Sequence, residues 1–583
     1  MIRRALTLAL LAVSAHAWSA VADLRTESEK SGFTRTGRYE EVEALCAAFQ
    51  KAYPREVRCT EFGRSPEGRP MMALIVTRTG AMIASEARRR NIPVVLMQGG
   101  IHAGEIDGKD AGFLALREVL EGKQAKGALD KQVLIFVPVF NVDGHERFGK
   151  WNRPNQRGPV EMGWRATAQN YNLNRDYMKA DTPEMRAMLA LVNAWDPVLY
   201  VDLHVTDGAK FEHDVSIQVE PVYSGDSDLR RLGAAVRDKT IEDINKKGSL
   251  AQPFYMSFVE TDNPASGFED SVSDPRFSTG YFQLRNRMAM LVETHSWKDY
   301  PTRVRITHNS IISVLEQMKQ DGARWQQIAQ EADNRQVQST ALTYKASDKA
   351  RMIDFRGYAY TRTPSEVSGA LMTRYDESQP QIWRVPVRDD VQPLLVASAP
   401  GAGYIVPAAW SELVAKKLAQ HAISFRTIGK DLAQFSVQTF RADEAKFGGA
   451  SFEGHQNLKV HGAWKPEARD IGKGALFVPV AQPKARLVMH LFEPQGPDSL
   501  NSWGFFNTAY ERKEYMEEYV AEEVAREMLA RDAALAAQFK QLLESDAAFA
   551  ASPARRLEFF ARRHSSWDER YRLYPVLRTD LAP

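Results

Sequence analysis

The chain has 583 residues, 44% of them hydrophobic and 26% charged, which predicts two or three globular domains. Its 76 Lys and Arg residues nearly balance 74 Asp and Glu residues, so the net charge implies no polyanionic or polycationic partner. The sequence contains no phosphate-binding glycine loop and no basic run interleaved with aromatic residues. Nucleotide and nucleic-acid binding are therefore unsupported.

Residues 1–22 are predicted to be a signal peptide. Two arginines precede a short apolar stretch, and small-residue cleavage sites follow it, ending at Ala17 or Ala22. The stretch is too short to span a bilayer, and no later segment has the length and apolarity that a span needs. We therefore expect a periplasmic or secreted protein. Cleavage lowers the number of Lys and Arg residues from 76 to 74, which makes the mature net charge about zero.

The two cysteines, Cys46 and Cys59, flank a helix-like stretch and the strand after it. In an oxidising compartment they could form a disulfide. Two buried free thiols are equally compatible with the sequence, because the distance between their Cα atoms decides the question.

Short apolar runs in the first half of the chain predict the fold. The runs at 93–97, 197–201 and 288–292 are rich in branched side chains and are typical of buried strands in a largely parallel sheet. After the first run, apolar residues recur at helical spacing through 113–120. We predict an α/β domain with a mixed, mostly parallel twisted sheet flanked by helices.

Four residues of catalytic type lie just past these runs: His102, Glu105, His204 and Glu293. The carboxyl ends of parallel strands meet at one edge of a sheet, where α/β folds place their sites. Two histidines and one carboxylate form a zinc ligand set that leaves the fourth position to water. Glu293 ends its own strand at the same edge, where a general base would be needed. A lone His-x-x-Glu occurs often by chance, so this hypothesis depends on the surrounding strand–turn–helix pattern.

Further motifs, in the same order along the chain, resemble the zinc carboxypeptidases, the carboxypeptidase A-like metallopeptidases. The similarity covers residues 35–320, about half of the chain. The ordered elements are His102-x-x-Glu105, the turn Asn141-Val142-Asp143-Gly144, Trp164-Arg165, Asn174-Arg175, His204 and Glu293.

The resemblance implies a role for each matching residue. One Zn²⁺ per chain would be held by His102, Glu105 and His204, and Glu293 would be the general base for a zinc-activated water. Arg165 would stabilise the oxyanion, although Arg153 and Arg157 lie in the same loop and stay open as alternatives. Asn174 and Arg175 would bind the C-terminal carboxylate of a peptide substrate, and Tyr281 would cover that substrate.

Position 172 departs from the pattern of many members of this family. They carry an aspartate two residues before the Asn-Arg pair, as the outer partner of the first zinc histidine, whereas this chain has Asn172. An amide oxygen can still accept a hydrogen bond from an imidazole, but it brings no charge.

The sequence predicts a catalytic domain at 23–325 and a C-terminal region at 340–583. The second region alternates short strands with Gly and Pro turns and ends in Ala- and Glu-rich helices. We predict an α+β accessory region of one or two subdomains, whose role no motif indicates.

The functional prediction is a secreted zinc metallocarboxypeptidase acting on peptides with a free C-terminal carboxylate. Two alternatives stay open: a zinc amidase acting on peptidoglycan stem peptides or acylated amino acids, and a non-catalytic secreted binding protein on a peptidase fold. Pseudoenzymes commonly lose the base or a metal ligand, and this chain retains Glu293 and all three candidate ligands. The preferred terminal residue, the oligomeric state and protein partners are not predictable from the sequence.

Overall fold

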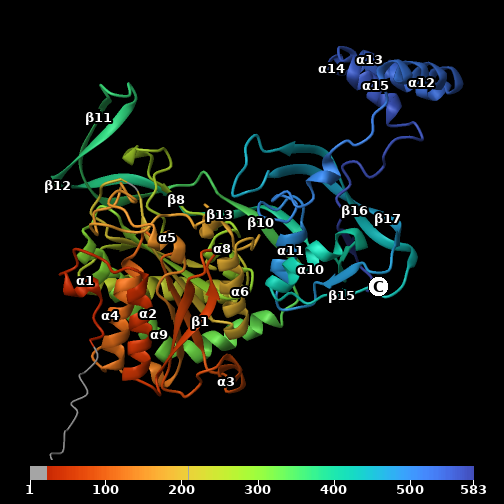
Figure 1. The fold of residues 1–583 in the computed structure, drawn as a ribbon. Helices are drawn as coiled ribbons and strands as arrows, with labels where there is room; N and C mark the ends of the chain where they lie inside the picture. The colour runs from red at the N-terminus through yellow and green to blue at the C-terminus, as the bar shows by residue number, and fades with distance from the viewer. Residues whose placement is uncertain (1–22, 208) are drawn as a thin grey trace, which may run out of the picture.

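The computed structural model describes residues 23–207 and 209–583 (Figure 1). The predicted signal peptide at 1–22 lies outside the described residues. No helix in the described part is both long enough and apolar enough to cross a membrane.

A mixed sheet forms the centre of the first half of the chain. Within the described residues it has eight strands in the order β1-β2-β4-β3-β5-β9-β6-β7. Its inner strands β4, β3, β5 and β9 run parallel, whereas β1 pairs antiparallel with β2, β2 with β4, and β6 with β9. At the far edge, β7 pairs in parallel with β6. The strands are β1 (Val57–Arg64), β2 (Pro70–Val76), β3 (Val94–Gly99), β4 (Val133–Val137), β5 (Leu199–Thr206), β6 (Val215–Glu220), β7 (Ala251–Gln252) and β9 (Met288–His295).

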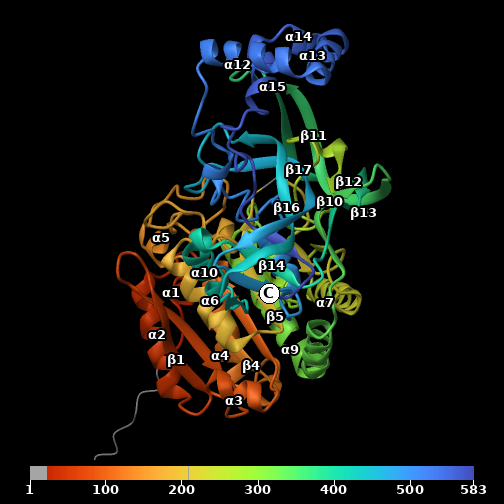
Figure 2. The same ribbon diagram turned by 90° about the vertical axis from the view of Figure 1, so that its right-hand side faces the viewer.

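The inner strands are parallel because helices connect them and cover the sheet. Every residue of β3, β4 and β5 is buried, as their continuous apolar runs predict. Figure 2 shows the helices around the sheet, with α6 crossing in front of it. The predicted mixed α/β fold flanked by helices is confirmed. The helices are α1 (Glu27–Lys30), α2 (Tyr39–Ala52), α3 (Ala84–Arg89), α4 (Asp107–Leu120), α5 (Val142–Glu146), α6 (Pro183–Trp195), α7 (Ser227–Lys246), α8 (Ser278–Gln283) and α9 (Tyr300–Asp333).

Local side chains fix where the long helices begin. Thr182 Oγ1 accepts a hydrogen bond from the Met185 amide, and Pro183 occupies the first turn of α6. Asp299 caps α9 in the same way through the Thr302 amide. These caps satisfy amides that a helix start leaves without a partner.

A long hairpin follows the first half of the chain. Strands β11 (Arg351–Pro364) and β12 (Leu371–Arg388) pair along their whole length. The end of β12 pairs in parallel with β8 (Phe268–Glu269), a short strand of the first half of the chain. Strands β10 (Ser339–Ala346) and β13 (Val391–Ser398) form a second ribbon, which lies between the two halves in Figure 1. The β11–β12 hairpin therefore stands on the first half of the chain, at the edge that Figure 1 shows uppermost.

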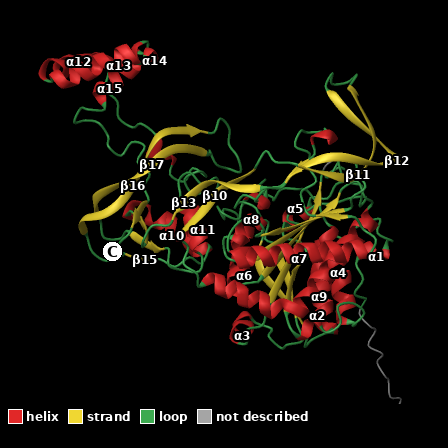
Figure 3. Cartoon of the chain, turned by 180° about the vertical axis from the view of Figure 1, so that it is seen from behind, coloured by secondary structure: helices red, strands yellow, loops and turns green. Residues whose placement is uncertain are grey.

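The rest of the chain forms a second α+β unit and a helical extension. Its sheet has the order β15-β18-β14-β19-β16-β17, and the long hairpin β16–β17 belongs to it. Helices α12 to α15 stand away from this sheet (Figures 1 and 3). The elements are β14 (Gly403–Val406), α10 (Ser411–Gln420), β15 (Arg426–Thr427), β16 (Leu432–Phe447), β17 (Leu458–Ile471), β18 (Leu476–Pro479), α11 (Ala485–Phe492), α12 (Glu518–Arg531), α13 (Ala533–Ser545), α14 (Ala547–Ala550), α15 (Pro553–Ala561) and β19 (Leu577–Thr579).

The two halves share one hydrophobic core. A single cluster of buried residues in the described chain extends from Leu24 in the first half to Val576 near the C-terminus. Polar contacts reinforce it, such as that between the Arg276 guanidinium and Asp498 at 3.1 Å. The domain boundaries given above stay predictions, but the C-terminal region is not a loosely tethered appendage.

Cys46 on α2 and Cys59 on β1 form a disulfide, with their Cα atoms 5.3 Å apart. This result decides between the two states that the sequence left open.

Candidate metal and substrate site

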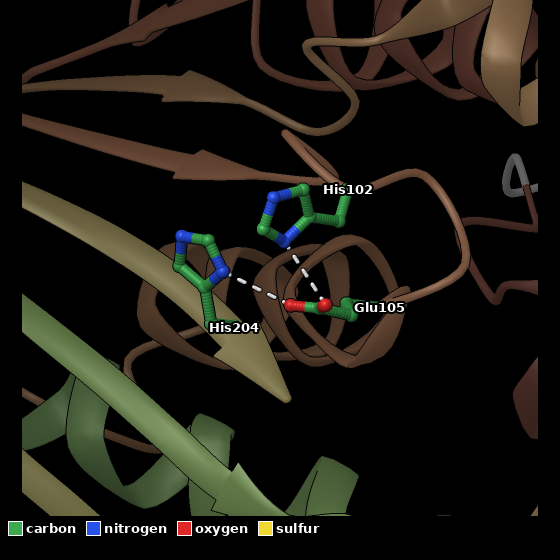
Figure 4. A group of neighbouring side chains, drawn as sticks. All are labelled: His102, Glu105 and His204. Carbon is green, nitrogen blue, oxygen red and sulfur yellow. Dashed lines mark hydrogen bonds and ion pairs between the residues drawn. The ribbon is translucent and has the colours of Figure 1, made fainter. Parts of the chain in front are cut away.

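The three predicted metal ligands lie together at the carboxyl edge of the sheet. His102 and Glu105 occupy the turn between β3 and α4, and His204 lies on β5. His102 Nδ1 is 3.0 Å from Glu105 Oε1, and His204 Nδ1 is 2.9 Å from Glu105 Oε2 (Figure 4). One potential ligand atom from each residue lies within 4.8 Å of the other two, and all three side chains are buried.

The outer nitrogens of both imidazoles also have partners. His102 Nε2 is 3.1 Å from Asn172 Oδ1, so the amide takes the place predicted for it. His204 Nε2 is 3.1 Å from Asp202 Oδ1. A metal-bound histidine characteristically donates a hydrogen bond from its other ring N–H to an oxygen acceptor, which fixes the orientation and tautomer of the ring. With both Nδ1 atoms directed at one carboxylate and both Nε2 atoms held from outside, these residues fit a Zn²⁺ ion.

Asp202 was not predicted from the sequence, although a signal existed. It lies two residues before His204 on the same strand, and residues i and i−2 of a strand share a face. Asp202 is itself held by Gln98 Nε2 at 2.8 Å and by the Ser278 hydroxyl at 2.6 Å.

The electrostatics of the cluster favour a cation. Burial lowers the pKa of His102 to about 4, so its imidazole is neutral at pH 7, as a metal ligand must be. Although burial raises the pKa of Glu105, His102 and Arg153 lower it well below its usual range. Burial lowers the pKa of His204, but Asp202 and Glu293 raise it well above the usual value. Three buried carboxylates thus surround the two imidazoles.

Glu293 lies beside this cluster on β9. In the pairing of β5 with β9, His204 and Glu293 are register partners, and residues paired in this way share a face of the sheet. Glu293 is buried, and its Oε2 has no hydrogen-bond partner among the described residues. Burial raises the pKa of Glu293 to about 8. A proton-accepting oxygen without a protein partner is what a general base requires.

The three candidate arginines differ in their contacts. Arg153 is buried, with Nη2 at 3.0 Å from Glu105 Oε1 and 3.3 Å from Asp207. Arg157 pairs with Glu377 at 2.8 Å. Arg165 has its Nη1 3.5 Å from Glu105 Oε1, and 38% of its side chain is exposed. Of the three, only Arg165 combines proximity to the ligand cluster with solvent access.

Asn174 and Arg175 lie in a short 3-10 turn at 173–175. Arg175 donates to the Asn174 carbonyl at 2.7 Å, and its guanidinium lies 4.4 Å from the centre of the Phe277 ring. No acid of the described chain forms an ion pair with it. Burial, together with Arg165 and Arg276, lowers the pKa of Arg175 to about 10. A half-buried guanidinium that lacks a counter-charge is suited to an incoming carboxylate.

The prediction that Tyr281 covers the substrate is wrong. Tyr281 lies on α8 and is fully buried, with its hydroxyl 2.9 Å from His421 Nδ1 and its ring 5.6 Å from that of Tyr177. It is a core residue that joins the two halves of the chain.

The tyrosine near the site is Tyr255, which the sequence did not indicate. Its hydroxyl is 3.3 Å from Thr206 Oγ1, at the end of the strand that carries His204. The negative charge of Glu293 raises the pKa of Tyr255, which indicates how close the two side chains lie. The loop that carries it has no periodicity or motif that could have identified it.

A turn of the C-terminal region reaches the same site. Glu453, in the turn between β16 and β17, accepts a hydrogen bond from the backbone N–H of Asn172 at 2.9 Å. His455 Nε2 lies 2.6 Å from Asp181 Oδ2. This turn therefore holds both ends of the segment 172–181, which contains Asn172, Asn174 and Arg175.

Residues 42–240 match the family model described as zinc carboxypeptidase. This part of the chain is similar to the zinc carboxypeptidases. The matched range includes the three candidate ligands and the Asn174-Arg175 pair, and Glu293 lies beyond it. The comparisons thus indicate a metallocarboxypeptidase.

Individual relatives are distant. The chain is 20% identical to carboxypeptidase 2 of Trichophyton rubrum over 459 residues, which are 76% of this chain and 79% of that protein. It is 28% identical to carboxypeptidase B of Helicoverpa zea over 160 residues, 25% of this chain and 36% of that one.

Solved structures are similar over about half of the chain. The carboxypeptidase A from Helicoverpa armigera has 17% identity and a TM-score of 0.36, covering 50% of this chain and 73% of its own. A metallo-carboxypeptidase from Burkholderia cenocepacia has 16% identity and a TM-score of 0.34, covering 47% and 68%.

Proposed function

We propose that the protein is a zinc-dependent carboxypeptidase that hydrolyses the C-terminal peptide bond of peptides, with one Zn²⁺ per chain. The observation that carries the proposal is the close grouping of His102, Glu105 and His204, with Glu293 in register beside His204. Arg175, a cation without an acidic partner in the described chain, adds a place for the terminal carboxylate.

His102 and His204 through Nδ1, and Glu105 through its carboxylate, would hold the metal. A zinc ion bound there supplies Lewis-acid chemistry, polarising a carbonyl and acidifying water. Asn172 and Asp202 keep the two imidazoles in orientation from outside.

Side chains of the protein would transfer the proton of the attacking water and stabilise the negative charges of the substrate. Glu293 Oε2 accepts the proton of the attacking water and later delivers it to the leaving amine. Arg165 donates hydrogen bonds to the carbonyl oxygen as negative charge develops on it. Arg175 and Asn174 bind the terminal carboxylate, which restricts cleavage to the last peptide bond.

The compartment proposed is the periplasm or the outside of the cell. The Cys46–Cys59 disulfide supports this assignment, because such bonds persist in oxidising compartments. The predicted signal peptide agrees with it.

A mixture of peptides with random C-termini, incubated with the zinc-loaded protein and followed by mass spectrometry, tests the proposal. We expect release of single amino acids from the C-terminus and one bound zinc per chain. Internal cleavage products, or an inert protein with one bound zinc, would refute it.

A further inference from the structure

A cavity lies between residues of the first half of the chain and the β11–β12 hairpin. Its volume is about 680 Å³, within the range of sites that bind small molecules and short peptide segments. Its walls include Lys210, Met256, Ser257, Phe258, Trp297 and, from β12, Tyr375.

The cavity is close to the proposed reaction centre because its walls leave the same strand ends. Lys210 follows the end of β5, which carries His204, and Trp297 follows the end of β9, which carries Glu293. Met256 is the neighbour of Tyr255, whose hydroxyl contacts Thr206 at the end of β5. His295 Nε2, 2.8 Å from the Ala209 carbonyl, joins the two strand ends.

The cavity and the proposed carboxylate site have different walls. Arg175 is surrounded by Phe277, Arg165 and Arg276, and none of these residues lines the cavity. A peptide with its terminal carboxylate at Arg175 and its last peptide bond at the ligand cluster must extend its remaining residues away from Arg175. The cavity is lined by residues that follow the ends of the strands carrying His204 and Glu293, and by none of the residues around Arg175.

The polar groups of the lining are largely occupied within the protein. Lys210 pairs with Glu377 at 2.9 Å, Arg374 pairs with Glu366 at 3.2 Å, and Asp262 accepts the Thr373 amide at 2.7 Å. The contacts left to a ligand are mostly apolar and aromatic surface. The Tyr375 ring is part of this aromatic surface.

We propose that this cavity binds the substrate residues upstream of the scissile bond and selects an aromatic or long aliphatic side chain there. The inference rests on the proposed carboxypeptidase function. It assigns the β11–β12 hairpin, which lies outside residues 42–240, a direct part in specificity.

Three substrates that share the same two C-terminal residues test the proposal. One is a blocked dipeptide, and two are pentapeptides with Phe or Gly at the third position from the C-terminus. We expect kcat/KM of the wild-type protein to be roughly tenfold or more higher for the Phe pentapeptide than for the Gly pentapeptide, from burial of one aromatic side chain. Ser257→Trp, at an exposed position of the cavity wall, should abolish this preference by filling the cavity and leave the dipeptide unaffected. Ser545→Trp, exposed at the end of α13, is the matched control and should change neither value.

Equal kcat/KM for the two pentapeptides would overturn the inference and leave the carboxypeptidase proposal standing. If Ser257→Trp lowers kcat/KM for the dipeptide as much as for the Phe pentapeptide, the substitution acts on the reaction centre. That result would also overturn the inference and leave the carboxypeptidase proposal standing. Failure of the wild-type protein to cleave any of the three would overturn both proposals.

Discussion

His204 on β5 and Glu293 on β9 lie side by side, as register partners on adjacent parallel strands. The pairing brings a candidate metal ligand and a candidate base together, although they are far apart in the sequence. Because strand register is fixed by burial on both faces of the sheet, this relationship is built into the rigid part of the fold.

Glu293→Gln should abolish turnover and leave metal binding intact. The amide preserves the shape of the side chain but cannot take the proton of water, so kcat should fall by about 10²–10⁴-fold. Zinc content measured beside kcat checks this. Glu412→Gln, at an exposed position on α10, is the control and should behave as wild type. Normal turnover in Glu293→Gln would remove Glu293 as the base.

Arg175→Ala should raise KM for peptides with a free C-terminus by about 10- to 100-fold, because a charge-assisted hydrogen bond is lost. Arg175→Lys should recover only part of that loss, since an ammonium group cannot bind both carboxylate oxygens in the same way. Steady-state kinetics on one substrate with the three proteins measure the effect. An unchanged KM in Arg175→Ala would contradict the assigned role.

Asp202→Asn should weaken zinc binding by about 10- to 100-fold, because the charged partner of the His204 outer nitrogen is lost. Competition with a chelator measures the zinc affinity, and circular dichroism of the metal-free protein shows whether the fold persists. Wild-type affinity in a folded variant would exclude this role for Asp202.

Glu453→Ala should raise KM by roughly 2- to 10-fold with little change in kcat. The substitution removes the acceptor for the Asn172 amide and loosens the segment that carries Asn174 and Arg175. Glu453→Gln keeps an oxygen acceptor and should restore most of the loss. Glu444→Ala, on β16 of the same hairpin, is the control. An equal fall in kcat for every substrate would indicate a general structural effect instead.

Ionisation of the buried Glu220 carboxyl should lower the free energy of unfolding as the pH rises. Burial raises the pKa of this carboxyl in the folded protein to about 8, from an ordinary value of 4.5. Its contribution to the free energy of unfolding is therefore fully present below pH 4.5 and lost as the pH rises through 8, by about 5 kcal/mol at most.

Glu220→Gln cannot ionise and should lack this part of the pH dependence. Urea unfolding of the two proteins at pH 6 and pH 9 measures it, with Glu316→Gln on the exposed face of α9 as the control. Parallel pH profiles for wild type and Glu220→Gln would show that Glu220 contributes nothing to it.

The sequence predicts the ligand cluster well because its signals are local. Each ligand directly follows an apolar strand run, and the parallel sheet brings those strand ends together. The outer partner Asn172 was likewise predictable by resemblance to the family.

Contacts between distant segments were not predictable. The Glu453–Asn172 hydrogen bond joins a turn of the C-terminal region to the site, and neither segment has a pattern that indicates the other. Tyr281 was misassigned for the same reason, because its partner His421 comes from the C-terminal region. Tyr255 lies in a loop without periodicity, where tertiary packing alone determines its position.

The most direct test of the central claim compares one peptide in two forms, with a free C-terminal carboxylate and with a C-terminal amide. The zinc-loaded protein should release the last residue from the free form only, because the amide offers no charge to Arg175. Cleavage of both forms at equal rates would contradict the account.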